Sequence, residues 1–379
     1  MENRNLNGNM FVMPQELMYQ IALTRIPLIG DVIIRKLLET FGTAGNIFKA
    51  KKQELERIET VGSVRANAIR GFRDFDAVEK EMIFIEKYRI RPLFCTDPDY
   101  PQRLQYCYDG PVMLYYKGSA SLNAGRIVSV VGTRRPSAYG KKICRQLTEE
   151  LAAAQITLVS GLAYGIDILA HQTALQAGIP TIGVLAHGLD RIYPAAHKQT
   201  ATAMIEQGGL LTDFMSGQLP DKQNFPKRNR IVAGLCDATI VVESGLQGGS
   251  LITADLATGY NRDVFCIPGQ VDDPHAAGCN HLIKDNKAML ITGATDILKM
   301  MGWENSARRA VPLQRELFLQ LSDNEQQILQ LFQDKPQRHL EELYLHTGLS
   351  GSQVATAVFN LEMQSLLKSL PGQRYELVQ

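Results

Sequence analysis

The sequence predicts an α/β protein with a doubly wound parallel sheet, preceded by a helical module and followed by a winged-helix domain. Apolar runs between residues 110 and 300 are each followed by a glycine turn and a helical stretch. These runs are mostly continuous rather than alternating, which is typical of strands covered by helices on both faces. A chain of 379 residues is also too long for one ordinary domain. We place the domains at residues 1–85, 90–300 and 320–379, with a linker at 303–319.

Composition excludes several classes of protein. The 40 basic and 39 acidic residues give a formal charge of +1, so the chain is not a polybasic nucleic-acid binder and must hold any anion by local clustering. Hydrophobic residues make up 45% of the chain and charged residues 21%, which predicts a folded core. Without an apolar run of 18 residues or a signal-peptide pattern, we expect a cytoplasmic protein that contacts no membrane. The six cysteines contain no CxxC pair, so we expect buried thiols, no metal site and no cofactor.

The first 85 residues contain a short internal echo. An apolar residue, a glycine (Gly30, then Gly62), a polar step and a helical period occur twice. The echo resembles a pair of helix-hairpin-helix units in a SAM-like module, where glycine lets backbone amides approach a DNA phosphate. The alternative is a helical module without DNA contact. Its expected packing residues are Leu28, Val32, Leu37, Val61 and Ile69.

Six strands are expected in the central domain. Their predicted ranges are 126–132, 155–161, 181–186, 210–214, 239–244 and 263–269. In a doubly wound sheet, ligands bind beyond the carboxyl ends of the strands. The turns after these strands are therefore the place to look for functional residues.

The C-terminal residues follow a winged-helix pattern. Residues 322–325 form a capping box that opens a helix, further helices are expected at 339–346 and 350–363, and residues 366–378 can form a hairpin around a Pro-Gly turn. The presumed recognition helix has no Lys or Arg, and residues 320–379 hold four basic against seven acidic side chains. Because reading a duplex needs positive charge that faces phosphates, we expect this domain to contact a protein partner or to regulate.

The first turn of the central sheet lies in an unusual stretch. Residues 110–148 contain seven Lys or Arg and no Asp or Glu. In the turn at 131–140, Gly132 permits a tight bend, Ser137 can cap the next helix and face an anion, and Arg134, beside Arg135, can form a bidentate phosphate contact. The alternative is a solvated basic surface with a helix cap. The phosphate loop of an ATPase is excluded, because the earlier glycine and the Ser or Thr after the lysine are missing.

Three later turns also contain glycines, hydroxyl-bearing side chains or cationic side chains. The second has Gly161, followed by Asp167 and His171, which are either an acid–base pair or a helix cap with a satisfied histidine. None of the four turns presents a recognisable nucleophile–base pair, so we expect a binding protein and not an enzyme. The third and fourth turns supply further expected contacts. Their expected DNA contacts are Phe225, Lys227, Arg228, Asn229 and Arg230 in the third turn and Gly248, Gly249 and Ser250 in the fourth.

Together these turns resemble the DprA/Smf (DNA-processing protein A) family. The matching segments are VGTRRPSAYG at 131–140, SGLAYGIDILAHQTAL at 160–175, FPKRNRIVAGL at 225–235 and GGSLITADLA at 248–257. The resemblance implies an extended Rossmann fold that binds and protects single-stranded DNA, dimerises, and loads the recombinase RecA during natural transformation. It assigns DNA contacts to Arg134, Ser137, Lys227, Arg228 and Arg230.

The resemblance also has departures. After Tyr193 and Pro194 the chain reads Ala-Ala-His-Lys, where members often have a charged residue and then Asn, so Lys198 is the expected replacement contact. The family's dimer contact falls near residues 278–291. The residues expected there are His281, Leu282, Ile283, Met289 and Leu290.

Two other functions remain open from the sequence. One is a Rossmann enzyme that cleaves a nucleotide with Glu243 or Asp167 as its acid. The other is an adaptor whose basic edge binds the acidic surface of a protein.

Overall fold

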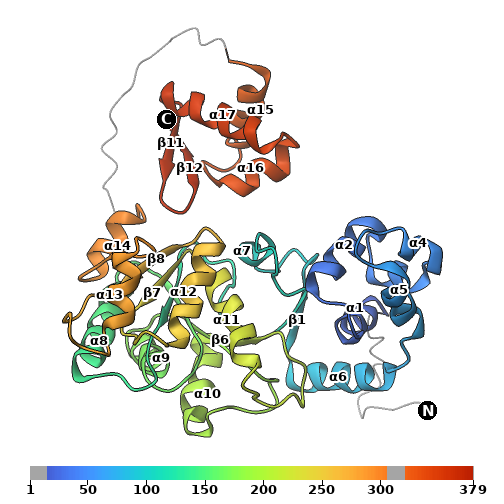
Figure 1. Ribbon diagram of the computed structural model, residues 1–379, viewed down its shortest axis with the longest axis horizontal. Helices are drawn as coiled ribbons and strands as arrows, with labels where there is room; N and C mark the ends of the chain where they lie inside the picture. The colour runs from blue at the N-terminus through green and yellow to red at the C-terminus, as the bar shows by residue number, and fades with distance from the viewer. Residues whose placement is uncertain (1–14, 305–320, 379) are drawn as a thin grey trace.

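A nine-stranded sheet forms the centre of the molecule. The computed structural model describes residues 15–304 and 321–378. The strand order is β1-β2-β6-β5-β4-β3-β7-β8-β9, parallel from β6 to β9, with β2 and β1 added antiparallel at one edge (Figure 1). The strands are β1 (Arg91–Phe94), β2 (Met113–Gly118), β3 (Ile127–Val131), β4 (Thr157–Ser160), β5 (Thr181–Val184), β6 (Gly208–Thr212), β7 (Ala238–Val241), β8 (Asp263–Cys266) and β9 (Met289–Leu290).

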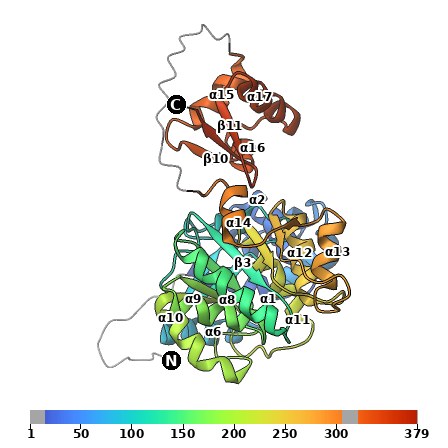
Figure 2. The ribbon, with the colours of Figure 1, turned by 90° about the vertical axis from the view of Figure 1, so that its left-hand side faces the viewer.

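Helices cover both faces of this sheet, which confirms the doubly wound α/β prediction and all six predicted strands. Figure 2 shows α8 and α9 on one side of β3 and α11 and α12 on the other. The helices are α7 (Gln102–Gln105), α8 (Ala138–Ala152), α9 (Ile166–Gln176), α10 (Lys198–Gln207), α11 (Asn224–Gly234), α12 (Gly249–Gly259), α13 (Ala277–Lys284) and α14 (Ala294–Met300), with a 3-10 turn at Ala195–His197. The described helices all fall short of the length and hydropathy that a membrane crossing requires.

The sheet has a topological switch point between β3 and β7. The chain leaves β3 through α8 toward β4, whereas β7 lies on the other side of β3 and leads through α12 to β8. Loops that diverge in this way leave a crevice at the carboxyl ends of the two strands. The predicted functional turns therefore meet at one edge of the domain.

The N-terminal module consists of six helices. Gly30 precedes one helix and Gly62 begins another, as the echo predicts. The buried residues include Leu37, but Leu28 is 64% exposed and Val32 47%, so the prediction that these two pack in the core is wrong. The helices are α1 (Gln15–Arg25), α2 (Asp31–Phe41), α3 (Ala44–Lys49), α4 (Lys52–Glu56), α5 (Gly62–Gly71) and α6 (Phe75–Tyr88).

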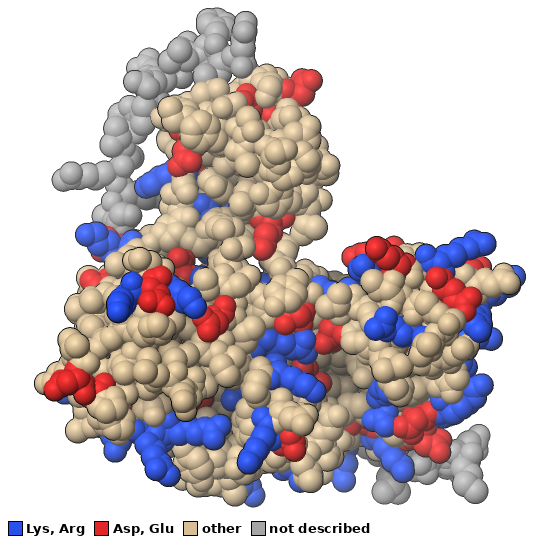
Figure 3. Space-filling view, viewed as in Figure 1, with Lys and Arg blue, Asp and Glu red and all other residues tan. Residues whose placement is uncertain are grey.

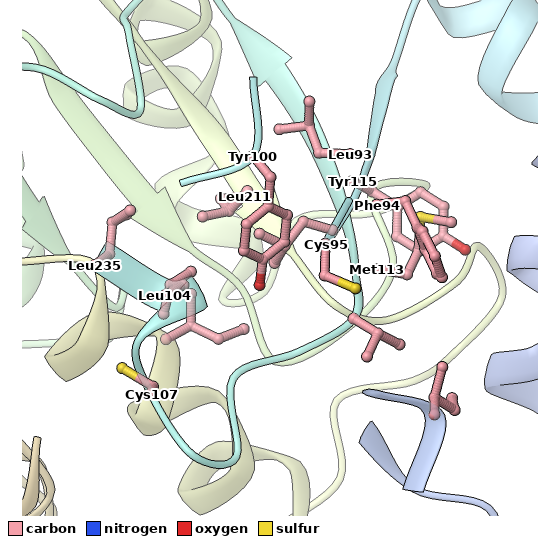
Figure 4. Packing of buried hydrophobic residues seen from close by; sticks show 14 of the residues in the cluster. Leu93, Phe94, Cys95, Tyr100, Leu104, Cys107, Met113, Tyr115, Leu211 and Leu235 are labelled. Carbon is pink, nitrogen blue, oxygen red and sulfur yellow. The ribbon is translucent and has the colours of Figure 1, made fainter. Parts of the chain in front are cut away.

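One continuous apolar cluster joins this module to the central sheet. Figure 4 shows Tyr100 beside Leu211 of β6 and Phe94 beside Tyr115 of β2, and the same cluster includes the buried apolar side chains of α1 to α6. Polar contacts reinforce the junction, because Arg35 of α2 donates to the carbonyl of Gly110 at 3.2 Å. All six cysteines are buried and unbonded, as expected of core thiols.

The C-terminal residues form the predicted winged helix. The capping box of Ser322 and Glu325 is present. Trp303, which the predicted boundaries place in the linker, instead packs in the core beneath α8 and α14 and is 7% exposed. The rest of that predicted linker lies outside the described residues, apart from Glu304. The elements are α15 (Asp323–Leu331), β10 (Gln337–His339), α16 (Leu340–Thr347), α17 (Gly351–Met363), β11 (Leu367–Leu370) and β12 (Arg374–Leu377).

This domain contacts the sheet at the end opposite the switch-point crevice. Arg374 of β12 donates to Asp237, which lies just before β7, at 2.5 Å. The ring of Tyr106 stacks on His339, with centroids 6.0 Å apart and planes 9° apart. The wing of the winged helix therefore contacts the amino ends of the strands, whereas the predicted functional turns lie at their carboxyl ends.

Candidate nucleic-acid interface

A cavity of about 650 Å³ opens at the switch point. All four predicted turns contribute to its wall. The predicted DNA-binding residues that line it are Gly132, Arg134, Gly161, Phe225, Arg228, Asn229, Gly248, Gly249 and Ser250. Folding therefore brings together residues that are more than a hundred positions apart in the sequence.

Two glycines allow these turns to approach one another. A β-carbon on Gly161 would lie 2.0 Å from Nη1 of Arg228, and one on Gly165 would lie 2.2 Å from the carbonyl oxygen of Thr133. Gly165 also has a φ of +83°, which side-chain-bearing residues rarely adopt. Glycine is required at 165, where the second turn packs on the backbone of the first, whereas a side chain at 161 would displace the guanidinium of Arg228.

Arg134 and Phe225 form the centre of the candidate interface. The exposed guanidinium of Arg134 lies over the ring of Phe225, with Cζ 5.4 Å from its centroid. The ring of Tyr193 follows, with its centroid 6.3 Å from that of Phe225. An arginine and two partly exposed aromatic rings provide one contact for a phosphate and flat faces for bases.

A second basic hollow continues the cavity past Arg134. Its lining includes Arg135, Lys141 and Arg145, together with the half-exposed ring of Tyr164. In Figure 3, Lys and Arg side chains gather along the edge of the α/β domain farthest from the C-terminal domain. The interface is thus an extended basic strip rather than a closed pocket.

The N-termini of α11 and α12 also contribute to the cavity. Each helix has 11 residues, no side-chain cap and no acidic residue in its first turn. A β-carbon built on Gly249 meets nothing within 4 Å, so the start of α12 is open. Free amides at the positive end of a helix attract anions, and α12 offers more of them than α11, where the amide of Asn224 donates to the carbonyl of Asp221 at 3.0 Å and Pro226 has no N–H.

The N-terminus of α8 is different, because a carboxylate of the protein already occupies it. Glu243, 4% exposed, accepts hydrogen bonds from the amide of Ser137 at 2.8 Å and from its hydroxyl at 2.5 Å. Ser137 also caps α8 by accepting from the amide of Gly140 at 3.0 Å. The cap was predicted correctly, but the prediction that Ser137 offers these groups to a DNA phosphate is wrong.

Comparison with known proteins agrees with this architecture. The family model for DNA recombination-mediator protein A matches residues 91–302, and the DprA winged-helix model matches residues 315–373. The chain belongs to the DprA family. Protein Smf from Synechocystis is 32% identical over 94% of this chain and 98% of its own length.

Two solved DprA structures share the fold. The structure from Streptococcus pneumoniae aligns with a TM-score of 0.65 and 35% identity, covering 74% of this chain and 97% of that one. The structure from Helicobacter pylori, whose description concerns a single-stranded DNA binding mode, aligns with a TM-score of 0.51 and 30% identity. It covers 56% of this chain and 94% of the other.

Arg228 is a buried part of the cavity wall in this DprA-family protein. It is 4% exposed and donates to the carbonyl of Val184 at 2.6 Å. Burial raises the pKa of nearby Asp167, although the Arg228 charge opposes that rise, and burial lowers the pKa of His171 to about 3. Arg228 therefore supports the wall, and His171 is a neutral core histidine hydrogen-bonded to Thr181 at 2.7 Å.

Other predicted contacts point elsewhere. Arg230 pairs with Asp31 at 3.0 Å and with Asp213 at 2.8 Å, so the prediction that it faces DNA is wrong and it instead ties α11 to the N-terminal module. The hydroxyl of Ser250 donates to Ser244 at 2.8 Å, which leaves the backbone of Ser250 for a ligand. Lys227 and Lys198 are exposed, although neither lines the cavity.

The predicted dimer contact of this family falls at the edge strand β9. Met289 is 38% exposed and Leu290 45%, and His281 is exposed on α13. Leu282 is 4% exposed and Ile283 is half-buried. Leu282 belongs to the core, so its predicted place on a dimer surface is wrong.

Three residues of the interface were missed as site residues. Tyr193 and Lys222 line the cavity, and Tyr164 lies beside Arg134 in the adjoining hollow. A signal exists for the tyrosines, since both follow predicted strands and are exposed aromatics. Lys222 lies in a loop before α11, where no local pattern marks it.

Replacing Glu243 by alanine is expected to lower the free energy of unfolding by about 2–3 kcal/mol, because two partly buried donors of Ser137 lose their acceptor and α8 loses an anion at its N-terminus. Urea unfolding measures the change. Glu149→Ala, which removes an exposed acid from the same helix, is the control. Equal midpoints for the two variants would contradict a capping role for Glu243.

Proposed function

We propose that this protein binds single-stranded DNA along the carboxyl edge of its sheet and delivers it to the recombinase RecA during DNA uptake, without catalysis. The observation that carries the proposal is the open strip that combines Arg134, two aromatic rings and the uncapped N-terminus of α12. The family resemblance and the Helicobacter pylori relative support DNA as the ligand.

The chemistry of the strip fits a single strand better than a duplex. Phosphates would contact Arg134 and the amides at the start of α12, and bases would stack on Phe225 and Tyr193. Paired bases in a duplex keep their flat faces stacked on one another, so aromatic side chains cannot reach them. None of these contacts reads a base edge, and binding should depend little on sequence.

The proposed partners, RecA and a second copy of the chain, are inferred from the family resemblance and not from the cavity. A homodimer through β9 and α13 would place two basic strips in one particle, and the two strips would engage a longer strand. In this proposal the protein acts in the cytoplasm, where it would meet RecA.

The nucleotide-cleaving alternative is disfavoured by the surroundings of its two candidate acids. Glu243 is committed to the cap of α8, and Asp167 is 7% exposed beneath the second turn. In dinucleotide-binding Rossmann folds the first helix N-terminus takes the pyrophosphate, but here it already holds a carboxylate.

The decisive test compares a labelled oligo-dT with the corresponding duplex at two salt concentrations. With about four phosphates neutralised, single-strand affinity should fall roughly 50-fold between 50 and 200 mM salt. The duplex should bind more weakly at both. A single-strand affinity that does not change with salt would overturn the proposal. Failure of oligo-dT to compete with an acidic protein surface would favour the adaptor alternative.

A further inference from the structure

The exposed face of α17 is apolar where the recognition helix of a duplex-reading winged helix would be basic. Ala355, Phe359 and Met363 are four residues apart and therefore lie along one stripe of the helix. Phe359 is 60% exposed and Met363 is 71% exposed. The helix contains no Lys or Arg. A helix face of this kind has nothing to offer a phosphate backbone.

The domain does not need this stripe for its own core. Val354, Val358 and Leu361 on the opposite side of α17 are 0%, 3% and 0% exposed. They pack with Ile328 and Leu343 from the two other helices of the domain. The stripe is therefore an additional apolar surface, of the kind that marks a binding site in a protein.

The wing is not available for a duplex either. Arg374 in β12 is held by Asp237, and Gly372 at the wing tip lies against Met301 and Asp263 of the α/β domain. Figures 1 and 2 both place α17 on the side of its domain away from the sheet, so the described residues of the α/β domain leave this helix uncovered.

The charge of the C-terminal domain indicates which kind of partner it would attract. Residues 320–379 carry four basic and seven acidic side chains. Lys335 and Arg338 both pair with Glu342, whereas Glu362, next to the stripe, forms no ion pair with any residue of 15–304 or 321–378. In the view of Figure 3 the C-terminal domain is mostly tan with scattered acids. The excess of acidic over basic side chains in this domain would attract a cationic segment.

We propose that the stripe of Ala355, Phe359 and Met363 docks a protein segment that forms an amphipathic helix with apolar anchors and flanking Lys or Arg. The anchors would pack along the stripe. A shallow hollow of about 220 Å³ between α15 and α17, lined by Gln353, Thr356 and Asn360, supplies hydrogen bonds at the rim. This interaction does not involve the DNA-binding strip and should leave DNA affinity unchanged.

The test uses the full chain and a fluorescein-labelled helical peptide of about 18 residues, with Leu at i, i+3, i+4 and i+7 and Lys elsewhere. A matched peptide carries Glu in place of every Lys. Fluorescence anisotropy should show binding of the Lys peptide only. Phe359→Ser and Met363→Ser should each weaken that binding by about 10-fold or more, as for a central interface anchor.

Val64→Ser is the matched control, because Val64 is 65% exposed on the N-terminal module and the substitution is of the same kind. Equal binding of the two peptides, or equal affinity of wild type and Phe359→Ser, would overturn the proposal. Sedimentation of wild type and Phe359→Ser tests whether a second copy of the chain occupies the stripe, and titration of both proteins with a DNA duplex tests whether DNA does. A smaller particle for the variant would assign the stripe to a second copy of the chain, and loss of duplex binding would assign it to DNA.

Discussion

Replacement of Arg134 by alanine is expected to weaken single-strand binding by about 1–3 kcal/mol, roughly 5- to 150-fold, with a similar loss for every base sequence. Arg134 lines both the main cavity and the adjoining hollow and lies over Phe225. Its removal would therefore eliminate the proposed phosphate contact and also the cation that faces the ring of Phe225. Anisotropy titrations at several salt concentrations should show the salt slope reduced by about one phosphate's share.

The matched control for Arg134 is Arg57→Ala, which removes the same charge from an exposed position on the N-terminal module. An equal loss of single-strand affinity in the two variants would mean that only the net charge of the protein matters. Phe225→Ala should also weaken binding by about 1–3 kcal/mol per stacked base. Because the two side chains touch, the double variant should lose less than the sum of the single losses.

The sequence allowed the sheet to be predicted because its signal is local. Each of the six predicted strands is a short apolar run buried on both faces, and the following glycine turn is adjacent in the chain. Strands β1, β2 and β9 were missed, because β9 has only two residues and the antiparallel pairing of β1 and β2 depends on distant partners. Tyr116, for example, pairs with Leu211. Strand β1 is four residues long and contains Pro92, which favours an edge position but gives no periodic signal.

The site could be predicted as a set of turns but not as a set of side-chain directions. Arg228 and Arg230 are two residues apart on one helix, and that spacing turns them about 200° from each other. One therefore lies in the cavity wall while the other reaches Asp31. Ser137 meets Glu243 from a different strand end, 106 residues away. Such long-range carboxylates decide which groups remain free for a ligand, and no local spacing reveals them.

The largest loss of stability is expected from Asp237→Ala, about 3–5 kcal/mol, because this 5%-exposed carboxylate balances two arginines. Arg103 donates to both of its oxygens at 2.9 Å, Arg374 donates at 2.5 Å, and the amide of Ile127 at the start of β3 donates at 2.9 Å. Alanine would remove the carboxylate acceptor from all of these donors, and only Nη2 of Arg103 would keep another, the carbonyl of Gly125 at 3.3 Å. Thermal or urea unfolding of the full chain measures the change.

Arg374→Gln separates the two roles of Asp237, which are its ion pair with the wing and its contacts within the α/β domain. It removes the wing's ion pair but leaves Arg103 and the β3 amide bonded, so the α/β domain should keep most of its stability while the C-terminal domain undocks. Small-angle scattering should then show a larger radius of gyration for Arg374→Gln than for wild type. An unchanged radius would mean that the stacking of Tyr106 on His339 is sufficient to hold the domain. In that case Asp237 acts within the α/β domain, as the counter-charge for Arg103 and the acceptor that fixes the start of β3.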